Sequence, residues 1–449
     1  MVVLVAISLL EYLTYRYRVG EDLLTVRSGW LERNLREIPF ARIHNIVVHQ
    51  SLLHRLFGVA ELRLESAGSA KPEAQMRVLR LDDALALEAR VRQRGQAMPA
   101  TGERDGASAT PVPARQLLLA LPPAEIVRLG LISNRGMIVF AAALGAAWQV
   151  LPDRWVANAF ERSGRQLYGY AEHLQPDRLH SALGAAAIVL LALALLRLLS
   201  ILLAFVQYHG FRLDESQKRL TVERGLFTRV RTSVAQRRIQ AWTLHEGLLH
   251  RLFRRRSLHV DTAAAQADET QARALRDLAP VIAPEQGDAL VRHLLPQRTW
   301  PPTQWQPVQG SGWRLFWPGA LVSLALAAGL AWRFQAGWTA LPLLWWPWGA
   351  LSAWQQARRL GYSVDDGLVA VRGGWFKRWW RFADLDKVQA LRLSRSPLDL
   401  RCGTATLWLD TAGAGSFEPA LCIPYLPHTT AQELLATLGK RLSRQRLRW

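Results

Sequence analysis

Cysteine is almost absent from this chain of 449 residues, which contains only Cys402 and Cys422. Two cysteines without metal-ligand spacing argue against a disulfide framework and against a zinc site. Motifs of catalysis are also absent: the sequence has no Gly-x-Ser-x-Gly, no His-Glu-x-x-His and no phosphate-binding glycine-rich loop ahead of a helix. We therefore expect no enzymatic activity, no catalytic residues, no cofactor and no metal.

Acidic residues are the minority charge. The chain has 56 Lys and Arg against 36 Asp and Glu, a net charge of +20, while 50% of its residues are hydrophobic. Basic cytoplasmic domains joined by transmembrane helices combine these two properties naturally. Nucleic-acid binding is the rival explanation of the charge. Because Lys and Arg are spread through the domains rather than gathered in one tail or stripe, we expect no nucleic-acid partner.

One stretch, Val26 to Gly68, occurs three times without a gap. The three copies align on Gly29, Gly225 and Gly374. Internal repetition of this kind defines the organisation of a chain. Because long hydrophobic segments separate the copies, they are not stacked solenoid units. We predict three copies of one domain, placed between membrane segments.

Each copy has the pattern of several short strands followed by one amphipathic helix. In the first copy, Leu23–Leu31 predicts a strand, and the alternation of apolar and charged residues over 60–65 predicts a half-buried strand. A helix is expected to begin near Asp82 or Asp83. In the third copy, Thr430 and Glu433 have the spacing of a helix capping box. Each domain is therefore expected to be α+β.

Four apolar segments between the copies predict two transmembrane hairpins. The first consists of Met137–Leu151 and Ser181–Val206; the second consists of Leu315–Trp332 and Trp338–Leu351, with tryptophans at its ends as in an interfacial belt. Met1–Leu13 is apolar but shorter than the ~20 residues of a span. We expect it to be the end of a transmembrane helix that begins upstream of Met1; a short interfacial anchor is the alternative.

The positive-inside tendency places the Arg-rich copies in the cytoplasm and the charge-balanced loop 152–180 outside. The three domains are expected at 14–94, 208–297 and 355–449. The membrane segments are a helix remnant at 1–13, a hairpin at 129–207 with its external loop at 152–180, and a hairpin at 313–354. Linkers are expected at 95–128 and 298–312.

Basic residues recur at fixed offsets in the three copies. A domain beside an anionic leaflet gains ~1 kcal/mol per basic residue near the surface. We predict these positions as contacts to lipid headgroups or to an acidic partner, with a solvated positive-inside face as the alternative. They are Arg33, Arg36, Arg42, Arg229, Arg231, Arg238, Arg378, Arg381 and Lys387.

Two histidine pairs share the spacing His-x4-His, His49 with His54 and His245 with His250. The third copy has no histidine at these positions, and a tight metal site needs three or four ligands. A structural turn is therefore favoured over a metal site.

Arg197 lies deep in a predicted span, where ionisable groups are costly and often functional. It is a candidate intramembrane site residue. The alternatives are that its side chain reaches toward one membrane face or pairs with a neighbouring helix.

The chain resembles the bacterial pleckstrin-homology-like membrane proteins of the YdbT-like family. The resemblance rests on Val26-Arg27-Ser28-Gly29-Trp30, Ile38-Pro39, Arg42-Ile43, Ser51-Leu52-Leu53-His54-Arg55-Leu56-Phe57-Gly58 and Leu129-Gly130-Leu131-Ile132-Ser133-Asn134-Arg135-Gly136. It implies a mixed membrane protein with three pleckstrin-homology-like (PH-like) domains. Each would be an antiparallel β-barrel or sandwich with a C-terminal helix, and transmembrane helical hairpins would link them. It also implies a full hairpin before the first domain.

We predict a non-enzymatic, multi-pass protein of the bacterial cytoplasmic (inner) membrane that presents three cytoplasmic PH-like domains as a scaffold or adaptor. Its expected partners are the lipid bilayer, with anionic lipid among the candidates, and other membrane proteins. The resemblance implies a smaller single-domain relative among these. The expected process is envelope maintenance or stress defence. The alternative is a lipid-handling or transport protein that uses the transmembrane helices as a pathway.

Overall fold

A computed structural model of the chain describes residues 10, 14–20, 22–29, 33–40, 43–66, 74–94, 115–150, 178–262, 276–308, 311–334, 337–365, 367–412 and 418–444. The chain divides into two compact units. One contains 1–118, 213–222 and 230–449, and the other contains 119–212 and 223–229. We describe each unit by itself.

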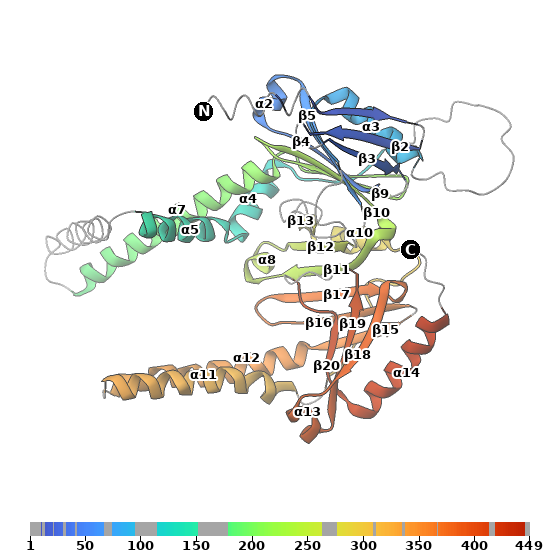
Figure 1. Cartoon of the computed structure of the whole chain (residues 1–449). Helices are drawn as coiled ribbons and strands as arrows, with labels where there is room; N and C mark the ends of the chain where they lie inside the picture. The colour runs from blue at the N-terminus through green and yellow to red at the C-terminus, as the bar shows by residue number, and fades with distance from the viewer. Residues whose placement is uncertain are drawn as a thin grey trace. The chain divides into compact units, whose positions relative to one another are not determined.

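The strands form three successive sets, which we call the first, second and third repeats (Figure 1). The first repeat contains β1 (Arg16–Val19), β2 (Leu23–Ser28), β3 (Asn34–Pro39), β4 (Ile43–Gln50), β5 (Val59–Ser66) and β6 (Ala74–Arg80). The second contains β8 (Arg212–Ser216), β9 (Arg219–Arg224), β10 (Arg229–Ala235), β11 (Ile239–Glu246), β12 (Arg256–Thr262) and β13 (Asp277–Ile282). The third contains β15 (Gly361–Asp365), β16 (Leu368–Gly373), β17 (Arg378–Asp384), β18 (Val388–Ser394), β19 (Thr404–Thr411) and β20 (Cys422–Pro427).

Each repeat also has a short helix after its fourth strand and a longer helix after its sixth. The short helices are α2 (Leu52–Leu56), α8 (Leu248–Leu252) and α13 (Pro397–Cys402). The longer ones are α3 (Leu81–Arg94), α10 (Pro284–Leu294) and α14 (His428–Arg444). Ala84, Leu87 and Val91 of α3 are buried in the core of the first repeat with Leu62 and Leu64 of β5, as their spacing predicts.

Strand pairing repeats position by position in the three copies. The fourth and fifth strands pair antiparallel, and a register shift follows the first residue of the fourth strand in every copy: Ile43, Ile239 and Val388. A residue one or two positions after each short helix has a positive φ: Gly58, Arg254 and Gly403. The ungapped sequence alignment therefore corresponds to equivalent backbone positions.

The sheets join neighbouring repeats. One seven-stranded sheet has the order β6-β5-β4-β10-β9-β8-β7, and another has the order β13-β12-β11-β17-β16-β15-β14. The second half of one repeat thus continues directly into the first half of the next (Figure 1). Only the end sheets, β1-β2-β3 and β18-β19-β20, contain strands of a single repeat.

The strands β7 (Gln116–Ala120) and β14 (Gln306–Pro307) lie in segments predicted as the linkers 95–128 and 298–312. These parts of the linkers therefore belong to sheets. Local pattern does not reveal this, because Gln306 and Pro307 pair with Tyr362 and Gly361 far along the chain. The predicted capping box was also wrong. Helix α14 begins at His428, directly after β20, so Thr430 lies inside the helix.

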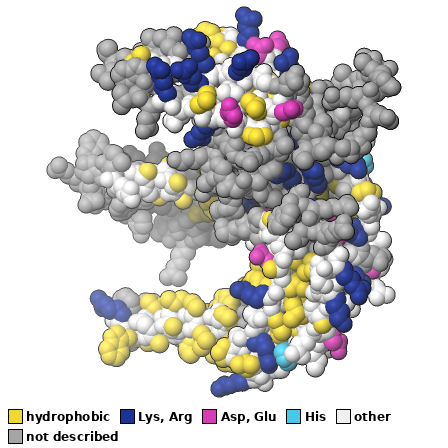
Figure 2. Space-filling view, turned by 45° about the vertical axis from the view of Figure 1, so that its right-hand side comes forward, with side chains coloured by type: hydrophobic (Ala, Val, Ile, Leu, Met, Phe, Trp, Pro, Cys, Tyr) yellow, Lys and Arg dark blue, Asp and Glu magenta, His cyan; other side chains and the backbone are white. Residues whose placement is uncertain are grey.

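The first unit contains an apolar hairpin of α11 (Ser311–Phe334), the 3₁₀ segment η3 (Gly337–Leu344) and α12 (Trp345–Arg359). Helix α11 packs along α12, and the hairpin surface is largely hydrophobic (Figures 1 and 2). Residues Gly312–Arg333 are long and apolar enough to cross a membrane. The returning arm, predicted as one span from Trp338 to Leu351, instead changes from 3₁₀ to α-helix at Trp345.

The second unit contains α4 (Pro123–Ile132), α5 (Arg135–Val150) and α7 (Arg178–Tyr208). Residues Ala186–Tyr208 of α7 pass the same test of length and hydrophobicity. Helices α4 and α5 pass it together but meet at an angle of 55°. The chain therefore has two candidate spans among the described residues, or three if the bent pair is one span. The predicted external loop 152–180 lies almost entirely outside the described residues.

Candidate functional site

The junction between the second and third repeats is the most elaborate polar and aromatic contact in the described chain. Strands β11 and β17 pair antiparallel, with Glu246 opposite Arg378 and Thr243 opposite Arg381. All eight residues of β11 are buried. A strand buried on both faces and paired on both edges is part of a core rather than a domain surface. We define the contacts across β11 and β17 as the β11–β17 junction.

Arg381 is the charged centre of this junction. Its side chain is 1% exposed and donates hydrogen bonds to the Asp261 carboxylate and, at 2.8 Å, to Thr243 Oγ1. Burial raises the pKa of Asp261, and the Arg381 charge and hydrogen bond oppose that rise. A buried ion pair tolerates the loss of one partner poorly, because the remaining charge stays desolvated. Arg381 and Asp261 therefore link the two repeats.

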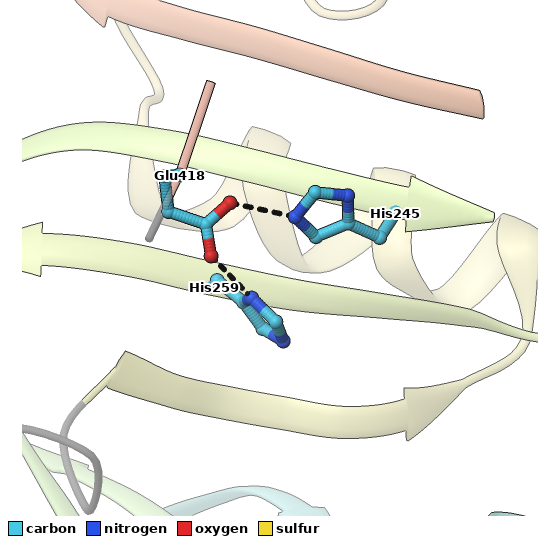
Figure 3. Close-up of side chains that lie close together, drawn as sticks. All are labelled: His245, His259 and Glu418. Carbon is cyan, nitrogen blue, oxygen red and sulfur yellow. Dashed lines mark hydrogen bonds and ion pairs between the residues drawn. The ribbon is translucent and has the colours of Figure 1, made fainter. Parts of the chain in front are cut away.

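A second polar cluster surrounds Glu418, which follows β19 in the third repeat and points at residues of the second (Figure 3). Its carboxylate accepts hydrogen bonds from His245 Nε2 at 2.6 Å and from His259 Nδ1 at 2.9 Å. Arg276 donates to the same carboxylate from Nε at 3.1 Å and from Nη2 at 2.7 Å. The Glu418 side chain is 2% exposed, so these bonds form in a desolvated site.

The electrostatics of this cluster follow from burial and from its single carboxylate. Burial raises the pKa of Glu418, but hydrogen bonds from His245 and His259 outweigh it and hold the pKa far below its usual range. Burial also lowers the pKa of His245 despite the bond to Glu418. Arg276, which donates two hydrogen bonds to Glu418, supplies a permanent positive charge beside the carboxylate.

The atoms His245 Nε2, His259 Nδ1 and a Glu418 oxygen lie close enough together to hold a metal ion. Two features disfavour this use. The separation of 2.6 Å between His245 and Glu418 is that of a hydrogen bond, and Arg276 donates to Oε1 of Glu418, the same oxygen that bonds to His259. The cluster is therefore better described as a hydrogen-bonded ion cluster. It also pairs His245 with His259 rather than with His250, the partner suggested by spacing.

Aromatic and charged side chains continue the junction along both strands. Phe382 of β17 stacks on Trp242 and Trp300, with ring centroids 6.4 and 4.0 Å apart. Glu246 of β11 accepts a hydrogen bond from Arg256 Nε at 3.1 Å and lies 3.6 Å from Arg378 Nη1. Cross-strand pairs of opposite charge stabilise a sheet by ~0.2–1 kcal/mol each.

At one end of the junction is an open pocket of about 500 Å³. Its lining contains four arginines and two glutamates: Arg251, Arg254, Arg255, Arg378, Glu246 and Glu285. The excess of guanidinium groups suits an anion.

The predicted basic contact positions have three different environments. Arg33, Arg36 and Arg229 are exposed, and Arg229 pairs with Glu223 of its own repeat at 2.8 Å. Arg238 is half-buried, and burial with the neighbouring Arg237 and Arg219 lowers its pKa to about 10. Arg42 lies outside the described residues.

The remaining four basic positions contact the preceding repeat. Arg231 lies 3.6 Å from the buried Glu88 of α3, and Lys387 Nζ donates to the Arg237 carbonyl at 2.7 Å. Arg378 and Arg381 join the β11–β17 junction as described above. Arg381 therefore cannot contact a lipid headgroup, because its guanidinium is buried and used within the chain.

Arg197 in α7 bonds to the break between α4 and α5. Its Nη1 donates to the carbonyls of Leu131 at 3.1 Å and Ser133 at 3.2 Å, and to Asn134 Oδ1 at 3.1 Å. The two carbonyls lie at the C-terminal end of α4, where a helix leaves its last carbonyls without intrahelical partners. The second predicted alternative, pairing with a neighbouring helix, fits this geometry.

Sequence reasoning missed the acidic and histidine partners of the junction, Glu246, His259, Asp261 and Glu418, and also Arg276. Glu418 and Arg276 lie outside the repeated stretch. One signal was available: the position of Glu246 is Gln50 in the first copy and Arg395 in the third, so the copies differ in charge where they join.

Comparison with known proteins follows the same division of the chain. The bacterial PH domain family matches residues 1–95, 126–295 and 319–442. The chain therefore belongs to the bacterial PH domain family. The transmembrane protein YdbT of Bacillus subtilis (strain 168) is 23% identical over 314 residues. That alignment covers 66% of this chain and 59% of the length of YdbT. No solved structure matches the chain.

Proposed function

We propose that the protein is a non-enzymatic membrane scaffold whose three PH-like repeats act as one continuous platform for other membrane proteins. The observation that carries this proposal is the β11–β17 junction, where two repeats share a sheet and bury Arg381, Asp261 and Glu418. Buried charged pairs fix one arrangement of the groups they join. A platform fixed in this way suits holding partners in register better than independent domains on linkers do.

Contacts with the hairpin support attachment of this platform to a membrane. Arg314 near the start of α11 donates to Asp399 of α13 at 2.7 Å and to Thr404 Oγ1 at 2.8 Å. Trp348 of α12 packs on Trp375 and Phe376 between β16 and β17, with centroids 5.5 and 5.4 Å apart. The third repeat is thus tied to both arms of the hairpin.

The proposal includes three further elements. The repeats are three PH-like domains linked by transmembrane hairpins, they lie on the cytoplasmic side of the inner membrane, and their partners are membrane proteins of the cell envelope. Its support is the positive charge of the repeats, the apolar helices and the family membership.

Crosslinking in native membranes, followed by mass spectrometry of co-purified proteins, tests the scaffold role. We expect a reproducible membrane partner with wild type and a reduced yield with Arg381→Ala, which breaks the junction. Arg441→Ala, an exposed arginine in the last turn of α14 and outside the junction, is the matched control and should leave the yield unchanged. A clean monomer in mild detergent, with no crosslinked partner, would contradict the scaffold role.

The arginine-lined pocket favours anionic lipid as a second ligand of the platform. Three of its four arginines, Arg251, Arg254 and Arg255, lie in α8 or just after it, and the fourth is Arg378 of β17. Purified full-length protein in nanodiscs should retain anionic lipid, and Arg251→Ala with Arg255→Ala should reduce the amount retained. Equal retention at low salt would exclude this use of the pocket.

Transport through the helices has less support. Arg197 is the charged residue that suggested a pathway, and it bonds to the ends of α4 instead. Arg197→Ala should therefore weaken the packing of α4 against α7 without removing a transport activity.

A further inference from the structure

The sheets that join neighbouring repeats leave one equivalent strand open at each end of the chain. Within the repeats, β4 pairs with β10 and β11 pairs with β17. The strand equivalent to β10 and β17 in the first repeat is β3, and the strand equivalent to β4 and β11 in the third is β18. Each is the last strand of its sheet, with no second neighbour among the described residues.

The exposure of these two strands differs from that of their joined equivalents. The first four residues of β3 are exposed, including Leu35 at 64%. In β18 only Val388 is buried, whereas every residue of β11 is buried. An exposed edge presents unpaired backbone N–H and C=O groups and can add a strand. The two open edges therefore have the backbone geometry of a joined repeat without its partner.

Head-to-tail pairing of two copies of this chain would bring β18 of one copy against β3 of the next. The register of β11 with β17 can be transferred to the equivalent positions. It places Arg395 opposite Arg33 and Arg392 opposite Arg36. Like charges directly opposite each other destabilise strand pairing. The joined strands have instead Glu246 opposite Arg378, and Asp261 beside Arg381.

We propose that the open edges β3 and β18 receive PH-like repeats of a different protein by antiparallel strand addition. The partner strands carry carboxylates opposite the arginines of these edges, as Glu246 does within the chain. Arginine at both ends excludes a second copy of the same chain and selects a partner with acidic edges. This inference rests on the proposed scaffold function, because it names the surfaces through which the scaffold takes its partners.

Charge reversal at one end converts the chain into its own acidic partner and supplies a defined probe. In Arg392→Glu with Arg395→Glu, β18 acquires carboxylates opposite Arg33 and Arg36 of a second copy. We expect the full-length variant in detergent to form head-to-tail oligomers with association about 10- to 100-fold tighter than wild type, since two repulsions become attractions. Mass photometry over a dilution series measures this change.

Three variants of the full chain control the experiment. Arg33→Glu with Arg36→Glu reverses the other end and should associate in the same way through the unaltered β18. Reversal at both ends restores like charge and should return the monomer. Arg392→Lys with Arg395→Lys keeps the charge and should behave like wild type.

The inference is overturned if both single-end reversals fold, with unchanged thermal unfolding, and remain monomeric. It is also overturned if wild type itself associates through these edges. Should one reversal fail to fold, the other still decides the result. A captured membrane partner without any reversal-driven association refutes the docking edges but leaves the scaffold role. Reversal-driven association without any captured membrane partner supports the docking edges but refutes the scaffold role.

Discussion

Strands β11 and β18 occupy the same position in successive repeats, yet one is interior and the other is an edge. Strand β11 is buried throughout because β17 pairs with it, whereas β18 has only one buried residue, Val388. The two strands differ in charge at two positions: Thr243 corresponds to Arg392, and Glu246 corresponds to Arg395, which follows β18. The same repeated backbone is therefore an interior strand in one repeat and an edge strand in another, and the charges on the two strands differ accordingly.

The largest expected effect comes from removing the buried arginine of the joined strand. Arg381→Ala leaves the Asp261 carboxylate buried without its partner, which costs about 3–5 kcal/mol. Arg36→Ala, at the equivalent open position, should change stability by less than about 0.5 kcal/mol. Denaturant unfolding of the full chain measures both. Equal effects of the two substitutions would show that the β11–β17 junction is no more stable than the open edge.

Lowering the pH should destabilise β11, the joined strand, before it destabilises β18, the edge strand. Burial, with the nearby His245, His259 and Lys377 charges, lowers the pKa of His250 to about 4. Below about pH 6.5 the unfolded chain takes up a proton at His250 more readily than the folded chain does. The stabilisation linked to neutral His250 is therefore complete above about pH 6.5 and is lost as the pH falls toward 4. This stabilisation amounts to at most about 3 kcal/mol.

Asp399, the residue equivalent to His250 in the third repeat, titrates in a different range. Burial raises its pKa, but hydrogen bonds from Ser396, Thr404 and Arg314 lower it to about 2. Its contribution is complete above about pH 4 and is lost only as pH falls from 4 to 2. Hydrogen exchange of β11 and β18 between pH 7 and 4, after division by the intrinsic exchange rate at each pH, should therefore show a loss of protection in β11 alone. His250→Asn should reduce this acid sensitivity.

Neutralising the carboxylate at the centre of the second polar cluster should have a smaller effect. Glu418→Gln keeps the size of the side chain but leaves Arg276 without its counter-charge, at a cost of about 2 kcal/mol. Glu433→Gln on the exposed side of α14 is the matched control, with no more than about 0.5 kcal/mol expected. Thermal unfolding distinguishes them. A Glu418→Gln protein as stable as the control would refute a structural role for the cluster.

The smallest effect concerns the turn after the short helix. Arg254 has φ 49°, where the equivalent Gly58 and Gly403 have 65° and 64°. Arg254→Gly should stabilise the protein by up to about 1 kcal/mol, because glycine adopts this conformation without steric cost. A Cβ at Gly403 meets no atom within 4 Å, so Gly403→Ala should cost a similar amount through the backbone alone. Unfolding midpoints of the two variants should move in opposite directions.

Sequence reasoning predicted what each copy determines locally. The positions aligned on Gly29, Gly225 and Gly374 all have positive φ, and the alternation over 60–65 falls in β5 with Leu62 and Leu64 fully buried. These features depend on residues near one another in the chain. Family membership followed from the same local motifs.

The joining of repeats was not predictable in this way. Each copy was predicted to form a separate domain. The sequence of one copy does not indicate which of its strands pairs with a strand of the next copy. Arg381 aligns with Arg36, so alignment assigned one role to a buried and an exposed arginine. The break between α4 and α5 was missed because both halves are apolar. In the structure the two helices meet at 55°, and Gly130 and Gly136 pack closely against Ile201 and Ser200 of α7.

A disulfide between β11 and β17 tests directly whether the second and third repeats share one sheet. In full-length protein with Cys402→Ser and Cys422→Ser, the pair Glu246→Cys and Arg378→Cys lies directly opposite across β11 and β17. Opposite strand positions are close enough for a disulfide, whereas Glu246→Cys with Asp384→Cys lies at the far end of β17. Mild oxidation in native membranes, read by mass spectrometry of linked peptides, should join the first pair and leave the second reduced. Equal or absent linkage in both would contradict a shared sheet.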